Sequence, residues 1–271
     1  MSILYNRLIA TMNEETAGSV EYCIATKMIE NINLISEVSI GKMAELCSVS
    51  KSKISNFIRD LGFDDYSDFR LEAYRERQKE VYIEDGSTVN VTDFMLEYGT
   101  EHYIEILRQD MSNLLSKIDY AQIAELVTNI HEYKKVAAFG KCYSETAAMN
   151  LQYKMSFYRK FIYTTINDRK QDKYIEEADE NTLLIIFSNK GRYISMHQSM
   201  DGNPEKECFN KTKAKVVLIT SCQEMEHDPR IDLFIGYHHS AKVQNHPFLY
   251  QLIIELIAVE YQKKYGFSLL N

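Results

Sequence analysis

The most regular alternation of apolar and polar positions in this chain lies between Ile40 and Gly62. Its second half has apolar residues at the spacing i, i+3, i+4 and i+7, which predicts a helix with one buried face: Ile54, Phe57, Ile58 and Leu61. Ser50 is suited to cap that helix, because its hydroxyl can accept a hydrogen bond from a free backbone N–H. Gly62 follows the last apolar position and should end the helix.

A second helix is predicted immediately upstream, with its inner positions at Ile40, Met43, Ala44 and Leu46. The four residues 47–50 would form the turn between the two helices. Two short helices joined by such a turn are the pattern of a helix-turn-helix, whose second helix enters the major groove of DNA. An ordinary helical hairpin with a solvated polar face is the alternative, because helix pairs with short turns are common in helical domains.

The rest of the first 80 or so residues is also predicted to be helical. Ser19 to Asn31 has apolar residues at helical spacing, and Phe63, Tyr66 and Phe69 are expected to hold a further helix, ending near Glu80, against the hairpin. Asp85-Gly-Ser-Thr88 is short, polar and turn-forming, which is typical of a linker. We therefore predict a helical domain over 1–82, a linker over 83–90 and a second domain over 91–271.

The pattern changes in the second domain, where short apolar runs alternate with longer amphipathic segments. Helices are predicted over Thr92–Ser116, Asp119–His131, Tyr143–Phe157 and Phe248–Lys264. Strands are predicted over Val136–Phe139, Phe161–Thr165, Thr182–Phe187, Lys215–Thr220 and Ile231–Ile235. This alternation favours an α/β domain with a mostly parallel sheet sandwiched by helices.

The outward side of the predicted second helix carries donors for phosphate oxygens and base edges. We predict that six of its residues contact DNA: Lys51, Ser52, Lys53, Ser55, Asn56 and Arg59. The whole chain has a formal net charge of −8, yet the stretch from Ser39 to Gly62 has more cations than anions. A local positive surface on an acidic protein is typical of a nucleic-acid interface.

Composition excludes several other classes. An apolar fraction of 45% and a charged fraction of 26% are those of an ordinary globular protein. No apolar run is long enough for a membrane span, and the N-terminus lacks the pattern of a secretory signal. The five cysteines are scattered without a Cys-x-x-Cys pair, which favours a reducing cytoplasm over disulfides or structural zinc. We therefore expect a cytoplasmic protein with no metal or other cofactor.

Two predicted strands end in polar turns, Gly140–Ser144 and Ser188–Arg192. In parallel sheets, ligands bind beyond the carboxyl ends of the strands, and a helix N-terminus can hold an anion. Four side chains from these turns could together form a phosphate pocket: Ser144, Ser188, Lys190 and Arg192. Considered alone, each is a weak signal, because a serine at a helix start is usually a cap and a Lys-Gly-Arg turn is usually solvated.

The order of these features resembles the RpiR family of bacterial regulators. That family has an N-terminal helix-turn-helix domain and a C-terminal sugar isomerase (SIS) domain that senses a phosphosugar. The stretch Ile40–Arg70 carries the most specific part of the resemblance, including Leu61-Gly-Phe63 and Tyr66-Ser-Asp-Phe69. In the second domain, Phe139–Ser144 stands where the family has Gly-x-Gly-x-Ser, and Ile186–Gly191 stands where it has Ile-Ser-x-Ser-Gly. The resemblance thus implies Gly191 as a further effector-binding residue.

The sequence departs from both family patterns. Cys142 replaces the second glycine, which limits how closely the backbone can approach a ligand. Lys190 replaces the second serine, and Tyr193 stands where a serine or threonine is common. Part of the hydroxyl lining is therefore lost. Lys190 could instead supply charge to a phosphate, or it could fill the pocket.

Catalysis is not expected. Isomerisation of a phosphosugar needs a positioned acid or base, and nothing in the sequence places the available groups beside Ser144 or Ser188. Those groups are Glu145, His197, His227 and His246. The pair His238-His239 has the pattern of surface residues at the end of a strand. The sequence contains no P-loop, no His-Glu-x-x-His and no dinucleotide fingerprint.

Together these observations predict a DNA-binding transcriptional regulator of carbohydrate metabolism, controlled by a phosphosugar bound to its SIS-like domain. One reader domain is too small for tight specific binding, so we expect a homodimer or higher oligomer on double-stranded operator DNA. Its subunits would meet through the second domain, including Thr92–Ser116 and Phe248–Lys264. Two alternatives remain: a phosphosugar isomerase or lyase with a helical extension, and a regulator whose second domain only dimerises.

Overall fold

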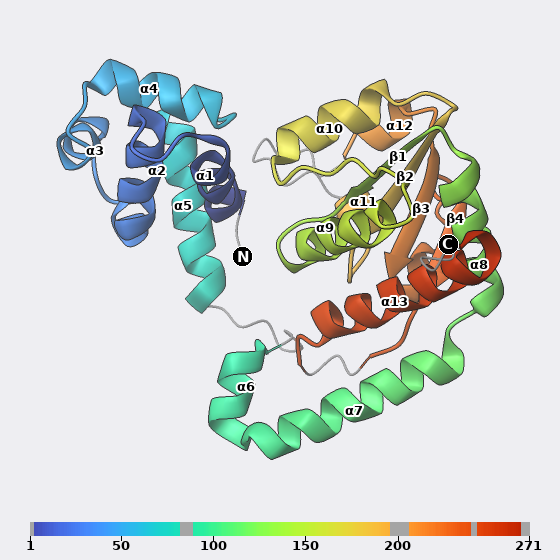
Figure 1. Cartoon of the computed structure of the whole chain (residues 1–271). Helices are drawn as coiled ribbons and strands as arrows, with labels where there is room; N and C mark the ends of the chain where they lie inside the picture. The colour runs from blue at the N-terminus through green and yellow to red at the C-terminus, as the bar shows by residue number, and fades with distance from the viewer. Residues whose placement is uncertain (1–2, 82–88, 196–205, 240–242, 267–271) are drawn as a thin grey trace. The chain divides into compact units, whose positions relative to one another are not determined.

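The computed structural model describes residues 3–81, 89–195, 206–239 and 243–266, which form two compact units. One is a helical unit from the N-terminal part of the chain, and the other is an α/β unit (Figure 1). The linker motif Asp85–Thr88 lies outside the described residues.

The helical unit contains five α-helices and one 3₁₀ turn among its described residues: α1 (Ile3–Glu14), α2 (Val20–Glu30), η1 (Ile32–Leu34), α3 (Ile40–Leu46), α4 (Lys51–Asp60) and α5 (Tyr66–Val81). Serines cap three of these helices at their start. The hydroxyls of Ser19, Ser39 and Ser50 each accept a hydrogen bond from the backbone N–H three residues ahead. The predicted cap at Ser50 is therefore confirmed.

Aromatic side chains hold α5 against the helix pair α3–α4. The rings of Phe63 and Phe69 meet edge to face, with centroids 5.2 Å apart, and both side chains are buried. The Tyr66 hydroxyl donates a hydrogen bond to the carbonyl of Val38, at 3.1 Å. These contacts confirm the predicted role of the three aromatic residues.

The α/β unit is built on a four-stranded sheet whose strands are all parallel and run in the order β1-β2-β3-β4. The strands are β1 (Lys135–Phe139), β2 (Thr182–Phe187), β3 (Lys215–Thr220) and β4 (Leu233–Gly236). Successive side chains point to opposite faces, and both faces of β2 are buried. Leu183 and Ile185 belong to one core, whereas Leu184 and Ile186 belong to the other.

Helices cover both faces of this sheet, as predicted (Figure 1). One core contains residues of α8 (Tyr120–Glu132), α9 (Tyr143–Ser156) and α13 (His246–Tyr265). The other contains residues of α10 (Asp168–Glu177), α11 (Arg192–Ser195) and α12 (Cys208–Lys211). A short 3₁₀ turn, η2 (Gln223–His227), follows β3.

Two predictions about elements were wrong. Thr92–Ser116 is two helices, α6 (Val91–Tyr98) and α7 (Thr100–Lys117). They are separated at Gly99, whose φ of 88° and ψ of 153° lie outside the helical region; this backbone conformation is open to glycine. Phe161–Thr165 is not a strand either: it makes only a single bridge, between Tyr163 and Ala137 of the edge strand β1.

Candidate functional site

The helix α4 has the sharply divided surface that a recognition helix needs. Ile54, Phe57 and Ile58 are buried in the core of the helical unit. The turn before the helix bends at Ser48, which has a φ of 54°, and the chain leaves it at Gly62, which has a φ of 88°. The predicted orientation of this helix about its axis is therefore confirmed, and the opposite face carries its polar residues.

Most of the predicted DNA-contacting residues are exposed on that opposite face. Lys51, Ser52, Asn56 and Arg59 are exposed, while Lys53 and Ser55 are half-buried. The Lys53 ammonium forms an ion pair with Glu21 of α2, and this pairing lowers the pKa of Glu21. Lys53 therefore has a carboxylate partner within the helical unit and is a weaker candidate for a phosphate contact than Lys51.

Arg59 is held along its own helix by two polar contacts. Its Nη2 donates to the Ser55 hydroxyl at 3.1 Å and to Asn56 Oδ1 at 3.2 Å. These are exposed contacts, which are weak in water and can be exchanged for a base edge or a phosphate. Arg59 and Asn56 thus lie together on the surface that would face DNA.

The second candidate site lies at the carboxyl end of the sheet, where β1 leads into α9. Gly140 has no room for a side chain, because a Cβ there would lie 2.6 Å from atoms of Ser144. Cys142 has a φ of 57°, which is uncommon for a residue other than glycine. Ser144 is buried in the first turn of α9. The tight turn predicted from the family pattern is therefore present, with Cys142 adopting the backbone that a glycine would adopt more easily.

The turn after β2 brings Ser188 to the same edge of the sheet. Its hydroxyl accepts a hydrogen bond from the backbone N–H of Tyr193, at 3.1 Å. Gly191 has a φ of 70°, and a Cβ there would meet Met225 at 2.5 Å. Lys190 and Arg192 are exposed. The buried hydroxyl of Ser188 thus already accepts one hydrogen bond from the backbone. The positive charge of this turn is carried by the exposed side chains of Lys190 and Arg192.

A residue that the sequence reasoning missed, Asn189, organises this edge of the sheet. Its Oδ1 accepts hydrogen bonds from Ser221 Oγ at 2.9 Å, from the Tyr237 hydroxyl at 2.8 Å and from His239 Nε2 at 2.9 Å. His239 is half-buried, so the prediction of a surface pair holds for His238 and is wrong for His239. Because Oδ1 is engaged, Asn189 can offer a ligand only the donors of its Nδ2 group.

Three further side chains extend this cluster: Tyr237, Tyr250 and His246 are all buried. The ring of Tyr250 meets those of Tyr237 and His246 edge to face, with centroids 5.6 Å away in each case. Burial raises the pKa of Tyr250, and the neighbouring side chains of Tyr237 and Ser144 partly oppose that rise. The Tyr250 hydroxyl is buried next to Ser144 but has no hydrogen-bond partner among the described residues.

His246 is a neutral imidazole inside the cluster. Burial lowers its pKa to about 4, with further lowering by the charges of His239 and Lys190. Its Nδ1 has no hydrogen-bond partner, which is uncommon for a buried polar atom. The structure therefore brings His246 close to the candidate pocket, which the sequence did not predict. The signal was its position in Asn245-His-Pro247, directly at the start of a helix.

Gln171 of α10 connects the two turns. Its side chain is fully buried, its Nε2 donates to the carbonyls of Gly140 and Thr165, and its Oε1 accepts from the Tyr193 hydroxyl. The Tyr193 ring also lies 3.5 Å from the ammonium of buried Lys206, which pairs with Asp172 at 2.7 Å. Tyr193 therefore occupies the space beside both turns that a serine or threonine would leave open.

The other candidate acids and bases do not form a recognisable catalytic group. His227 is exposed in η2, Glu145 is half-buried in the first turn of α9, and His197 lies outside the described residues.

Within the described ranges, no group of three or more His, Cys, Asp or Glu residues is arranged to hold a metal ion. None of the helices described is both long and apolar enough to span a bilayer.

Comparison with known proteins agrees with this two-part architecture. Residues 4–80 match the profile of the helix-turn-helix domain of the rpiR family. The chain is 21% identical over 246 residues to an uncharacterised helix-turn-helix-type transcriptional regulator of Providencia stuartii, covering 90% of this chain and 83% of that protein. Residues 4–80 of this chain are thus a helix-turn-helix domain of the rpiR family.

Solved structures show the same fold beyond that domain. The Vibrio vulnificus NanR protein, complexed with ManNAc-6P, superposes with a TM-score of 0.52 at 14% identity, covering 97% of this chain and 92% of that one. A candidate sugar-phosphate isomerase of Listeria monocytogenes superposes with a TM-score of 0.50 at 12% identity, covering 62% of this chain and 89% of that one. At these identities the likeness establishes the fold alone, an α/β unit built on a parallel sheet.

Proposed function

We propose that this regulator binds double-stranded operator DNA through α4 and that a phosphorylated sugar, bound beyond the carboxyl end of its sheet, controls the binding. The protein would act in the cytoplasm as a homodimer and would have no catalytic activity of its own. Effector binding would favour one arrangement of two reader domains, and that arrangement would fit or misfit the operator spacing.

One observation carries the effector half of this proposal: buried polar groups converge on the edge of the sheet where ligands of such folds bind. Ser144, Ser188 and Asn189 come from two adjacent strand ends, and the cluster around Tyr250 adjoins them. A phosphate could be held by the N–H groups at the start of α9, by the ammonium of Lys190 and by donors of Asn189. The complex of NanR with ManNAc-6P supports the chemical class of the ligand.

The same edge is poorly equipped for isomerisation. A base near neutral pH needs a pKa close to 7, whereas the buried imidazole of His246 has a pKa of about 4. Tyr193 and Lys206 fill space beside the turns that a reacting sugar would need. The alternative of an isomerase predicts turnover of hexose or aminosugar phosphates, and a coupled assay across such a panel tests it directly.

The deciding experiment is calorimetry with a panel of hexose and N-acetylhexosamine 6-phosphates, each compared with the unphosphorylated sugar. We expect binding that requires the phosphate group. Lys190→Ala should weaken that binding at least tenfold, because a charge-assisted contact contributes about 1.5–3 kcal/mol. The matched control is Lys213→Ala, which removes an exposed lysine at the opposite end of the sheet, just before β3.

Three results would count against the proposal. If the parent protein binds no member of the panel, the sensing role is wrong. If no phosphosugar stabilises the parent but Lys190→Ser creates binding, then Lys190 blocks the pocket and the α/β unit has only a structural role. If Lys213→Ala weakens binding as much as Lys190→Ala, the effect is one of net charge and does not locate the site.

A further inference from the structure

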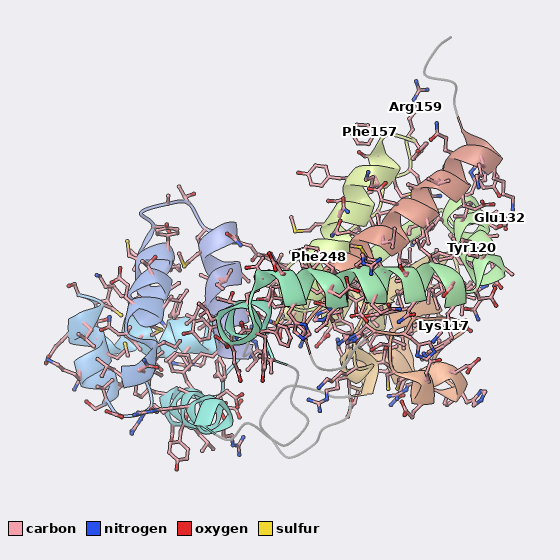
Figure 2. The ribbon with its side chains drawn as sticks, turned by 90° about the horizontal axis from the view of Figure 1, so that it is seen from below. Lys117, Tyr120, Glu132, Phe157, Arg159 and Phe248 are labelled. Atoms are coloured by element: carbon pink, nitrogen blue, oxygen red, sulfur yellow. The ribbon has the colours of Figure 1, made fainter. Side chains whose placement is uncertain are left out.

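Asn245, the residue before α13, ties the start of this helix to α7. Its Nδ2 group donates a 2.8 Å hydrogen bond to Oδ2 of Asp110 on α7, and both side chains are buried. Figure 2 shows Phe248, in the first turn of α13, next to α7. A buried carboxylate is stable only where hydrogen bonds replace water, so Asp110 favours the arrangement in which Asn245 faces it.

Asn245 occupies the N-cap position of α13 without capping the helix. Asparagine is among the best N-cap residues, because its side-chain oxygen accepts a hydrogen bond from a backbone N–H of the first turn. Asn245 makes no such bond, and its backbone is helical, with a φ of −83° and a ψ of −13°. Asn90, at the start of α6, has an extended backbone and does cap its helix, accepting from the N–H of Asp93. A second arrangement is thus open to Asn245, in which its side chain turns from α7 to cap α13.

Unpaired polar atoms show that the observed arrangement leaves hydrogen bonds unmade. Among the described residues, Oδ1 of Asn245 and Nδ1 of His246 are buried and have no hydrogen-bond partner, although buried polar groups nearly always have one. Capping would give Oδ1 of Asn245 a donor. That donor is the backbone N–H of Phe248, which now donates to the carbonyl of Asn245, because Pro247 has no N–H. The hydrogen bond to Asp110 would thus be exchanged for a helix cap.

The segment that leads into α13 also contacts the residue that follows the linker motif. Val243 pairs with Val89 in a parallel bridge, and the backbone N–H of Gln244 donates to the carbonyl of Val89 at 3.0 Å. Val243 shares a small core with Phe94 of α6 and Tyr103 of α7. Val89 belongs to the predicted linker, 83–90, so a movement of this segment displaces the point at which the linker meets the α/β unit.

The other end of the segment reaches the candidate effector site. His246 follows Asn245 directly, and its ring centroid lies 6.2 Å from that of Tyr143, the residue before Ser144. A ligand can bond to the buried Nδ1 of His246 only if the imidazole shifts, and such a shift displaces Asn245. Because a ligand changes an equilibrium by binding one arrangement better than the other, a ligand at this edge would favour the arrangement in which His246 has moved.

We propose that Asn245 is a two-position switch that connects effector binding with DNA binding. Without effector, its side chain is held by Asp110. With effector bound, it turns away to cap α13, and the released segment shifts Val89 and the linker. This inference rests on the proposed function, because it states how the effector of that site acts. Asp110 then opposes effector binding, since the ligand must break the hydrogen bond between Asp110 and Asn245.

Calorimetry on the full chain tests the switch, with glucose 6-phosphate, N-acetylglucosamine 6-phosphate and N-acetylmannosamine 6-phosphate as probes. Asp110→Ala removes the acceptor and should raise the affinity for any probe that the parent binds by about threefold or more. Asn245→Ser should do the same, because serine caps helices well and its side chain is too short to reach Asp110.

Two matched variants separate the hydrogen bond from other effects of these substitutions. Asp110→Asn keeps an oxygen that can accept the hydrogen bond from Asn245, so its affinity for the probes should stay within about twofold of the parent's. Glu105→Ala removes an exposed carboxylate from the same helix, where Glu105 pairs with Arg108, and should leave the affinity unchanged. Circular dichroism and urea unfolding establish that the variants are folded.

DNA binding shows whether the switch acts on the reader domain. The probe is DNA selected from a random pool by the parent protein, and fluorescence anisotropy gives the affinities with and without sugar phosphate. Without sugar phosphate, Asp110→Ala should bind this DNA with the affinity that the parent shows at a saturating concentration of sugar phosphate.

Three results would overturn the switch while the parent still binds a sugar phosphate. Unchanged or weaker probe binding by either Asp110→Ala or Asn245→Ser would show that Asp110 does not oppose the effector. An equal gain in Glu105→Ala would assign the effect to net charge. Tighter probe binding without a change in DNA affinity would show that the segment does not act on the reader domain. In these cases the sensing role stands, whereas a parent that binds no sugar phosphate removes both the proposed function and the switch.

Discussion

The Tyr193 hydroxyl donates a 2.6 Å hydrogen bond to Oε1 of Gln171, and both side chains are buried. The same Gln171 donates through Nε2 to the carbonyl of Gly140, while the backbone N–H of Tyr193 donates to the Ser188 hydroxyl. The turns after β1 and β2 are thus joined to each other through one residue of α10. A ligand that displaces either turn would act on that helix.

Tyr193→Phe should destabilise the α/β unit by about 1–3 kcal/mol, because it leaves the buried Oε1 of Gln171 without its donor. Urea unfolding measures the effect. Tyr120→Phe is the control, since the Tyr120 hydroxyl bonds to the carbonyl of Leu115 at an exposed position and its loss should cost little. Equal stability of Tyr193→Phe and the parent would show that this hydrogen bond is not maintained in solution.

His246 should make stability depend on pH. Burial lowers its pKa to about 4 from 6.5, so the folded protein keeps the ring neutral where the unfolded chain takes up a proton. The neutral ring of His246 therefore makes its full contribution to the free energy of unfolding above pH 6.5. This contribution is lost as the pH falls toward 4. The loss between pH 7 and pH 5 should be about 2 kcal/mol.

Chemical unfolding of the parent and of His246→Gln, at several pH values between 7 and 5, measures this dependence. The variant should have the flatter profile in that interval. His227→Gln, which alters an exposed histidine, should follow the parent. Parallel profiles for the parent and His246→Gln would mean that the imidazole is already protonated or solvated in the fold.

Much of the fold could be predicted because buried apolar residues recur in the sequence at the spacing of the helix or strand that carries them. The run Thr182–Phe187 is apolar throughout, as expected of a strand covered on both faces. The helix α10 left little such trace, since among its ten residues Tyr174 and Ile175 are the apolar ones. One of the residues that α10 buries is polar, Gln171. Buried polar residues do not recur at a regular spacing that can be recognised in a sequence.

The candidate site was predicted only in part for a related reason. Ser144 and Ser188 follow strand ends directly, so the topology of a parallel sheet brings them together. Asn189, His239 and His246 meet through long-range hydrogen bonds and ring contacts that no local spacing encodes. The break at Gly99 was missed because the apolar period continues across it from α6 into α7, although glycine permits the conformation that separates them.

Phe57→Ala should destabilise the helical unit by roughly 2–5 kcal/mol, because it opens a cavity in a packed core. Ile58→Ala should act in the same range. Leu71→Ala, which removes an exposed apolar side chain of α5, is the control and should change stability by less than about 1 kcal/mol. Thermal unfolding followed by circular dichroism measures all three, and two core variants as stable as the parent would contradict the packing of α4.

The exposed side of α4 gives the last prediction. Arg59 and Asn56 lie on the face opposite that core, so replacing either should weaken specific DNA binding by about 1–3 kcal/mol if it contacts a base edge. Folding should hardly change, because their contacts with each other are exposed. Operator sequences selected from a random DNA pool by the parent protein serve as the probe, and titration by fluorescence anisotropy gives the affinities. Arg77→Ala is the control: it removes the same charge from α5, where Arg77 pairs with Glu37. If Arg77→Ala weakens binding as much as Arg59→Ala, the loss reflects net charge, and the assignment of Arg59 as a base-contacting residue is wrong.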